Sequence, residues 1–421
     1  MEDIKITIDQ LQTGLYIRLP AKWHEHPFLL NSFKLKTQEQ IEIIRHLGIS
    51  HVFINPNKSD FDPYFSPLPA DTATQQPEPD KKQLDETAQA MWEEKNKRIE
   101  KVKTYRRKAL QCEKDFERSL SRTRAIMNKI RTQPQHAVTE ASMLVEDIVE
   151  QLLSEEEVTL HFINSNSEFE DIYFHSLNVA VLSMMVGKAK GYSAEKIKLL
   201  ALGSLFHDIG KVKVPSKIVR ATRTLTEPEQ NYLRQHTRYG IEIADTIENF
   251  PEEAKCIIAQ HHEMIDGSGY PEGLSGNEID ELAQVVALTN AFDVLCHANT
   301  PKEKKIPYSA LSYLYKQQSL FNQENLNLLI KYMGVYPPGS IVQLSNDLIG
   351  LVVSVHSNQL LYPSVLMYDA SVPRSQAPII DLSEKESLSI VTVLSPGKIP
   401  EEVLEYLNPR SRISYFFDKD E

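Results

Sequence analysis

Histidine and aspartate side chains follow apolar runs in the middle of the chain, a pattern that predicts a metal site. The run KLLALGSLF leads into His207 and Asp208, and the run IIAQ leads into His261 and His262. His175 and His236 also align with apolar residues at helical spacing. Two further oxygen donors accompany them on helical patterns, Asp171 one turn before His175 and Asn290 in a fifth segment. These segments are expected to point their polar groups into one interior.

A single histidine on an apolar face is usually a core residue with a satisfied hydrogen bond. Burying many such groups without partners is costly, and coordination to a cation removes most of that cost. Imidazole and carboxylate ligands without cysteine suit Fe, Mn, Ni or Co better than structural zinc. The donors outnumber the needs of one ion, which indicates two or three ions, and paired ions are a standard arrangement for hydrolysing phosphate esters.

Two paired motifs resemble the HD-GYP family, a subset of the HD-domain metal-dependent phosphohydrolases. They are HDIGK (207–211) and HHEMIDGSGYP (261–271). The flanking runs FHSLNVA, KVKVPSKIV and HTRYG also match, as does GVYPPGSIVQLSNDLIGLVV nearer the C-terminus. The opening TGLYIRLPAKWHEHPFLLNSFKL is similar to a small N-terminal domain often joined to this family.

The resemblance implies a cytoplasmic bacterial signalling enzyme that hydrolyses cyclic di-GMP to a linear dinucleotide or GMP, with cyclic GMP-AMP as another substrate. It implies two or three divalent ions, Fe or Mn first, with Ni, Co or Mg as others. Asp208 would bridge two ions, and Lys211 would contact the substrate phosphate, which suits a compact ammonium. The implied metal ligands are Asp171, His175, His207, Asp208, His236, His261, His262 and Asn290. The implied substrate-binding residues are Lys211, Asp266, Gly269, Tyr270 and Pro271.

Three departures from the family pattern fall on the same site. Asn290 stands where the family has its last aspartate ligand, and an amide oxygen binds a cation without supplying charge. Met264 replaces a basic residue after HHE, and a basic segment is represented only by Lys302, Lys304 and Lys305. Three interpretations stay open: an active cyclic-dinucleotide phosphodiesterase, a degenerate module that binds nucleotide or partner proteins, and a hydrolase of another phosphate ester.

The elements that would position these groups predict a mainly α fold. We expect a helical HD-type metallohydrolase bundle with a small α+β N-terminal domain and a short β-rich C-terminal extension. The small domain spans 1–58, a Pro-rich linker 59–83, a long charged helix 84–138, the hydrolase domain 139–333 and the β-rich extension 334–421. The charged helix has an imperfect heptad pattern, so it either packs on its own domain or forms a dimer.

Composition limits the partners. The net charge of −12 argues against a DNA- or RNA-binding surface, which needs excess Lys and Arg. Three cysteines without CxxC spacing fit a reducing cytoplasm, and no apolar run reaches the ~20 residues of a membrane span. Besides the nucleotide, the expected partner is a second copy or a signalling protein bound through residues 1–138.

Overall fold

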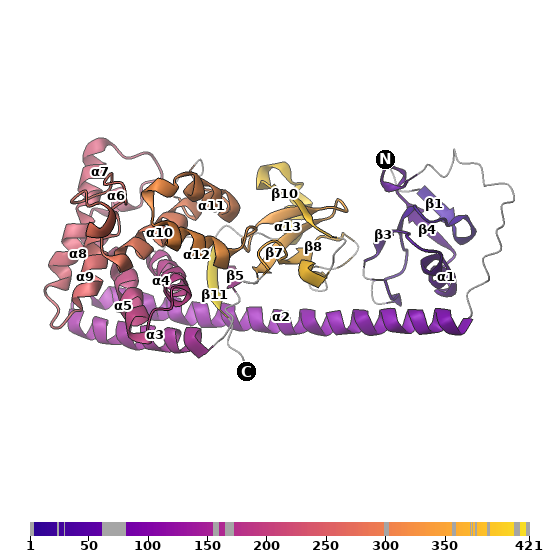
Figure 1. Ribbon diagram of the computed structural model, residues 1–421, viewed down its shortest axis with the longest axis horizontal. Coiled ribbons are helices and arrows are strands. Elements are labelled where there is room, and N and C mark those ends of the chain that lie inside the picture. The colour runs from indigo at the N-terminus through magenta and orange to yellow at the C-terminus, as the bar shows by residue number, and fades with distance from the viewer. Residues whose placement is uncertain are drawn as a thin grey trace. The chain divides into compact units, whose positions relative to one another are not determined.

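A computed structural model describes most of the chain as two compact units (Figure 1). The described residues are 4–22, 25–28, 30–60, 81–154, 160–164, 172–298, 303–355, 359–370, 372, 374, 377–384, 388–407 and 413–417. One unit comprises residues 1–105 and 369–378, and the other residues 106–368 and 379–421. Within the described ranges, no helix is long and apolar enough to cross a membrane.

The N-terminal unit contains an antiparallel sheet of four strands in the order β1-β4-β2-β3, helix α1 (Gln38–His46) and the start of the next helix. The strands are β1 (Ile4–Thr7), β2 (Tyr16–Arg18), β3 (Ser32–Lys34) and β4 (His51–Ile54). Thr37 caps α1 by accepting a hydrogen bond from the backbone of Gln40, and Gly48 adopts a left-handed φ of 69° just after the helix. The expected small α+β fold is confirmed.

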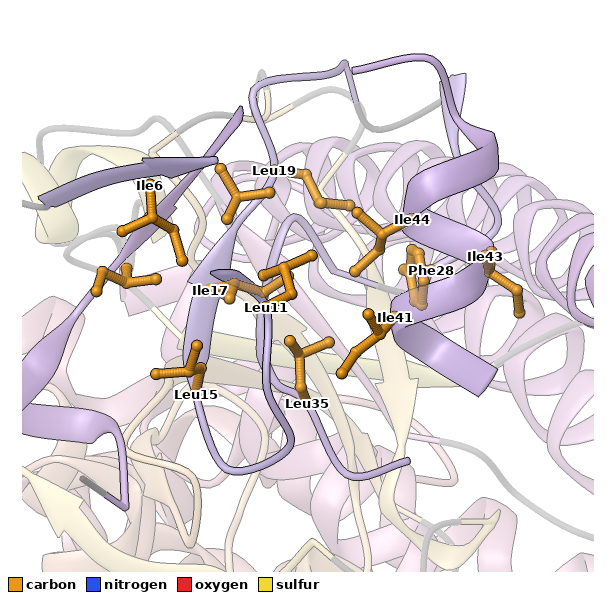
Figure 2. Close-up of a cluster of buried hydrophobic side chains, with 12 residues drawn as sticks. Ile6, Leu11, Leu15, Ile17, Leu19, Phe28, Leu35, Ile41, Ile43 and Ile44 are labelled. Carbon is orange, nitrogen blue, oxygen red and sulfur yellow. The ribbon is translucent and has the colours of Figure 1, made fainter. Parts of the chain in front are cut away.

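The core of this unit lies between the sheet and α1 (Figure 2). Ile17 and Ile54 point inward from paired positions of β2 and β4. Ile41 and Ile44 lie one helical turn apart on α1 and are also fully buried. The period of two in the strands and of three to four in the helix therefore places both apolar faces against each other.

Two long helices follow, α2 (Lys81–Lys129) and α3 (Pro134–Ser154). The single helix predicted for 84–138 is wrong at its end, because a turn at 130–133 separates α2 from α3. Pro134 opens α3, where a missing N–H costs nothing. In the second unit, α2 buries Phe116, Leu120 and Met127, which supports packing on its own domain.

A helical bundle forms most of the second unit. Its central helices α4 (Ile172–Ala189) and α5 (Ala194–Phe206) pack on each other, and α9 (Glu252–Gln260) and α10 (Glu281–Cys296) pack against them (Figure 1). The remaining helices of the bundle are α6 (Ser216–Val219), α7 (Glu227–Arg234), α8 (His236–Ala244), α11 (Pro307–Lys316) and α12 (Gln323–Met333).

The segment around His236 forms two helices, α7 and α8. A capping box of Thr226 and Glu229 begins α7. The helix then ends at Arg234, and α8 starts afresh at His236. This break matters for the site because it leaves carbonyl groups at the end of α7 without partners in the helix.

The β-rich extension forms most of an antiparallel sheet of seven strands, in which β10-β6-β7-β5-β11 are consecutive, β8 pairs with β7, and β9 pairs with β8. The strands are β6 (Ile341–Leu344), β7 (Ile349–Val355), β8 (Ser364–Met367), β9 (Ile379–Asp381), β10 (Ile390–Leu394) and β11 (Ile413–Phe417), with helix α13 (Glu401–Leu407). The sheet also includes β5 (Leu160–Asn164), which pairs with β7 and β11 although it precedes the bundle. The mainly α fold with two β-containing parts is confirmed.

Candidate metal centre

Six of the predicted ligands lie in two groups that share one carboxylate. The first group consists of His175, His207 and Asp208, and the second consists of Asp208, His236, His261 and His262. In each group, one potential ligand atom of every member lies within 4.8 Å of the others. Asp208 is 2% exposed, so its charge is held inside the bundle between the two groups.

Helix ends fix the orientation of three of these histidines. His207 follows α5, His236 begins α8 after the end of α7, and His261 follows α9. Each Nδ1 lies close to the carbonyl oxygen three residues earlier, at 2.6 Å for His207 and Ser204, 2.7 Å for His236 and Leu233, and 3.0 Å for His261 and Ile258. A carbonyl only accepts, so Nδ1 carries the proton and Nε2 presents a bare lone pair.

The bare nitrogens of the second group converge on the shared carboxylate. His236 Nε2 and His261 Nε2 are 3.2 Å apart, too close for two lone pairs with nothing between them. Asp208 Oδ1 lies 3.3 Å from the first and 3.7 Å from the second, and it has no hydrogen-bond partner among the described residues. A buried anionic oxygen facing lone pairs is stabilised by a cation, so these side chains fit a divalent ion.

In the first group, imidazole nitrogens again lie close to Asp208, but a carboxylate and not a backbone carbonyl orients the ring of His175. His175 Nε2 lies 3.1 Å from His207 Nε2 and 3.4 Å from Asp208 Oδ2. His175 is in the first turn of α4, where the backbone carbonyls accept hydrogen bonds within the helix. Its Nδ1 donates instead to Asp293 Oδ2 at 2.7 Å. A carboxylate behind an imidazole is a common way to orient a metal ligand.

Burial and neighbouring charges set the protonation of the site. Burial lowers the pKa of His236 to about 3, and it also lowers the pKa of His207 and His262 well below the usual range. These rings are therefore neutral, as metal ligands must be. Burial would raise the pKa of Asp208, but the charge of Lys211 and the surrounding imidazoles outweigh it and lower the pKa.

His175 differs from the other rings. Burial lowers its pKa, yet the hydrogen bonds to Asp208 and Asp293 outweigh burial and raise the pKa to about 9. Burial likewise opposes ionisation of Asp293, but His297 and His175 lower its pKa below the ordinary value. An ion in the first group must therefore replace a proton on His175.

Asp293 is the residue that the motifs did not predict. Its carboxylate is 1% exposed and accepts from three side chains, His175 Nδ1, Asn178 Nδ2 at 2.7 Å and His297 Nδ1 at 3.1 Å. Asn178 and Asp293 are 115 residues apart, so only the packing of α4 on α10 brings them together. The spacing of Asp293 one turn after Asn290 was the sole hint in the sequence.

The turn after the histidine pair closes back on it. A Cβ atom at Gly269 would lie 2.4 Å from the backbone nitrogen of Met264, so only glycine allows this approach. Tyr270 stacks on the ring of His262 with a centroid distance of 4.5 Å. Glu263 accepts hydrogen bonds from three backbone N–H groups of the turn, those of Glu272, Gly273 and Leu274. The loop thus supports His262 from outside.

A cavity of about 630 Å³ opens beside the first group, and its lining includes His175, Asp208, Asp293 and Lys211. Lys211 donates to Asp208 Oδ2 and faces this space. The predicted residues of the turn, Asp266, Gly269, Tyr270 and Pro271, are not among its described lining residues.

Asp266 has a local role that the sequence interpretation missed. Its Oδ1 accepts from the backbone of Ser268 at 3.0 Å and from its hydroxyl at 2.6 Å, which fixes the turn. Pro271 follows Tyr270 through a cis peptide bond.

The predicted roles of Asp171 and Asn290 as metal ligands stay predictions. Asp171 lies outside the described residues, as does Lys302 among the basic candidates. Asn290 is 5% exposed on the buried face of α10. Its place as a ligand is an expectation from the motif alone.

Comparison with known families agrees with this geometry. A model described as "HD domain" matches residues 130–323, and "Domain of unknown function (DUF3391)" matches residues 3–141. The chain carries an HD domain. The predicted HD-GYP resemblance and its N-terminal partner domain are therefore confirmed. The HD domain contains every described residue of the two ligand groups.

Relatives of the HD-domain chain include several phosphodiesterases. A cyclic di-GMP phosphodiesterase of Pseudomonas aeruginosa is 25% identical over 89% of this chain and 87% of its own length. A cyclic di-GMP phosphodiesterase response regulator of Xanthomonas campestris is 35% identical over 35% of this chain and 39% of its own. A 3'3'-cGAMP-specific phosphodiesterase of Vibrio cholerae is 33% identical over 36% and 34%. The likeness to the last two is confined to part of each protein.

Proposed function

We propose that the protein is a metal-dependent phosphodiesterase that cleaves a bacterial cyclic dinucleotide, cyclic di-GMP before 3'3'-cGAMP. The observation that carries this proposal is the convergence of imidazole nitrogens from two ligand groups on both oxygens of the buried Asp208. The relatives act on cyclic dinucleotides by name, and a cavity lies next to the ligand groups.

Different residues of the chain would bind the ions, bind the phosphate and orient a metal ligand. The five histidines and Asp208 would hold two ions, with Asp208 between them. Divalent ions in such a site supply Lewis acidity toward phosphoryl oxygens and lower the pKa of water. Lys211 lies between Asp208 and the cavity, where its ammonium can bind a phosphoryl oxygen. Asp293 accepts from His175 Nδ1, which would leave Nε2 to bind an ion once its proton is displaced. Cys296 is buried with a raised thiol pKa, which makes it a poor nucleophile.

The test is turnover with defined metals. Protein loaded with Mn²⁺ or Fe²⁺ is incubated with cyclic di-GMP, and linear dinucleotide and GMP are separated by chromatography. The double variant H207A/D208A is expected to lose both bound metal and turnover. H46A, which removes an exposed histidine of α1, serves as the matched control and keeps both.

Each alternative has its own outcome. Nucleotide binding without turnover across both metals contradicts the proposal and identifies a binding module. Hydrolysis restricted to other phosphate esters also contradicts it and indicates a different HD-type hydrolase.

A further inference from the structure

The cavity beside the metal centre is lined by basic side chains that do not belong to either ligand group. Three basic side chains line it: Lys211, Arg220 and Lys304. Lys211 is bonded to Asp208 at the metal centre. Arg220 stands just after α6, and its guanidinium has no hydrogen bond or ion pair with any residue that the structure describes. A cation that faces a cavity without a carboxylate partner is available to a ligand.

Aliphatic side chains also line this cavity. They are Val212, Val214, Val219 and, from α7, Leu233. Apolar side chains of this kind suit the face of a nucleobase. The lining therefore combines charged groups of the metal centre and Lys211 with aliphatic surface and the guanidinium of Arg220.

We propose that Arg220 reads the O6 and N7 edge of a guanine base in the cyclic dinucleotide. This inference rests on the proposed function and names the residue that selects its base. The guanidinium offers two parallel N–H donors, which match the two acceptors on that edge of guanine. Adenine presents N7 and an amino group there, so one donor would face another donor.

A phosphate is the competing ligand for Arg220, and the surroundings favour the base. Lys211 already supplies a compact positive charge next to the ions, where the scissile phosphate must lie. Arg220 is instead flanked by Val219 and by Ala221 in the sequence, and aliphatic side chains line the same cavity. A planar fork beside an apolar surface is suited to a planar heterocycle.

The experiment compares cyclic di-GMP with cyclic di-AMP on the metal-loaded protein and on three variants. R220K keeps the charge but loses the fork, R220Q loses the charge, and R223K is the control. Arg223 is ion-paired with Glu229 and does not belong to the described lining of the cavity. Selectivity is the ratio of kcat/KM where the dinucleotides are cleaved, and the ratio of Kd where they are bound without cleavage.

A guanine contact predicts that the wild type and R223K prefer cyclic di-GMP by about ten-fold or more, and that R220K and R220Q both lose this preference. A phosphate contact predicts that R220K keeps the affinity for both dinucleotides while R220Q weakens both equally, which would overturn the inference. Binding without cleavage refutes the proposed enzyme but still decides the role of Arg220. A wild type that neither binds nor cleaves either dinucleotide refutes both.

Discussion

Replacing Asp293 with asparagine is expected to weaken the binding of one ion and leave the binding of the other unchanged. The carboxylate accepts from three donors, and an amide has only one accepting oxygen. If that oxygen serves Asn178 and His297, two of the three bonds are kept and the new NH₂ group faces His175. His175 must then accept at Nδ1 and carry its proton on Nε2, the atom that faces Asp208 and the ion.

The size of the loss in metal affinity follows from removing the carboxylate that orients one ligand, His175. Removing the partner behind a metal-binding imidazole typically weakens metal affinity by about 10- to 100-fold. That range corresponds to roughly 1.4 to 2.8 kcal/mol. Only the ion held by His175, His207 and Asp208 is affected, because the other group contains no ligand supported by Asp293. A mispaired buried donor also lowers the free energy of unfolding by about 1–3 kcal/mol.

Calorimetric titration with Mn²⁺ and metal analysis of the purified protein measure the two ions separately. The matched control is D280N at the start of the same helix, because Asp280 caps α10 and asparagine caps equally well. D293N should titrate one tight and one weakened site, while D280N should keep the wild-type curve. Two unchanged sites in D293N would refute the idea that Asp293 sets the tautomer of His175.

Three further predictions concern other parts of the chain. E263Q should lower the free energy of unfolding by about 1–3 kcal/mol, because an NH₂ group then faces a backbone N–H of the turn. Unchanged thermal unfolding and unchanged amide protection at Leu274 would contradict this prediction. N290D should raise metal content if the amide is a ligand, and equal content in both forms would place Asn290 outside the ligand shell. Burial lowers the pKa of Lys95 to about 8 from its ordinary 10.5. The unfolded chain therefore binds more protons between these values, so stability should rise with pH from about 8 to 10.5. K95M should reduce that slope in denaturant titrations, and the same slope in both proteins would argue against a buried, strained ammonium.

Local signals in the sequence predicted much of the site. His207, Asp208, His261 and His262 were found because each pair follows an apolar run. The capping box before α7 was equally local, since it depends on residues three apart. These features follow from short-range periodicity and capping, which a single sequence displays directly.

The features that the sequence did not predict depend on distant contacts. Asp293 supports His175 across 118 residues of chain. The pairing of β5 with β11 joins segments about 250 residues apart, as Leu160 opposite Phe417 illustrates. No local pattern encodes either partner, because pairing is decided by burial against the rest of the fold.

The shared carboxylate requires α8, which carries His236, to lie close to Asp208, and Gly210 permits this approach. Gly210 lies beyond the end of α5 at Phe206, so it does not serve as the stop of that helix. A Cβ atom at Gly210 would lie 1.8 Å from the carbonyl oxygen of His236 and 2.5 Å from the nitrogen of Gly240. The chain after Asp208 therefore lies directly against α8, which carries His236. Because this contact is between backbones, it fixes the start of α8 close to Asp208, and His236 Nε2 lies 3.3 Å from Asp208 Oδ1. The HDIG spacing thus places a helix-end histidine, a bridging carboxylate and the next helix in one rigid unit.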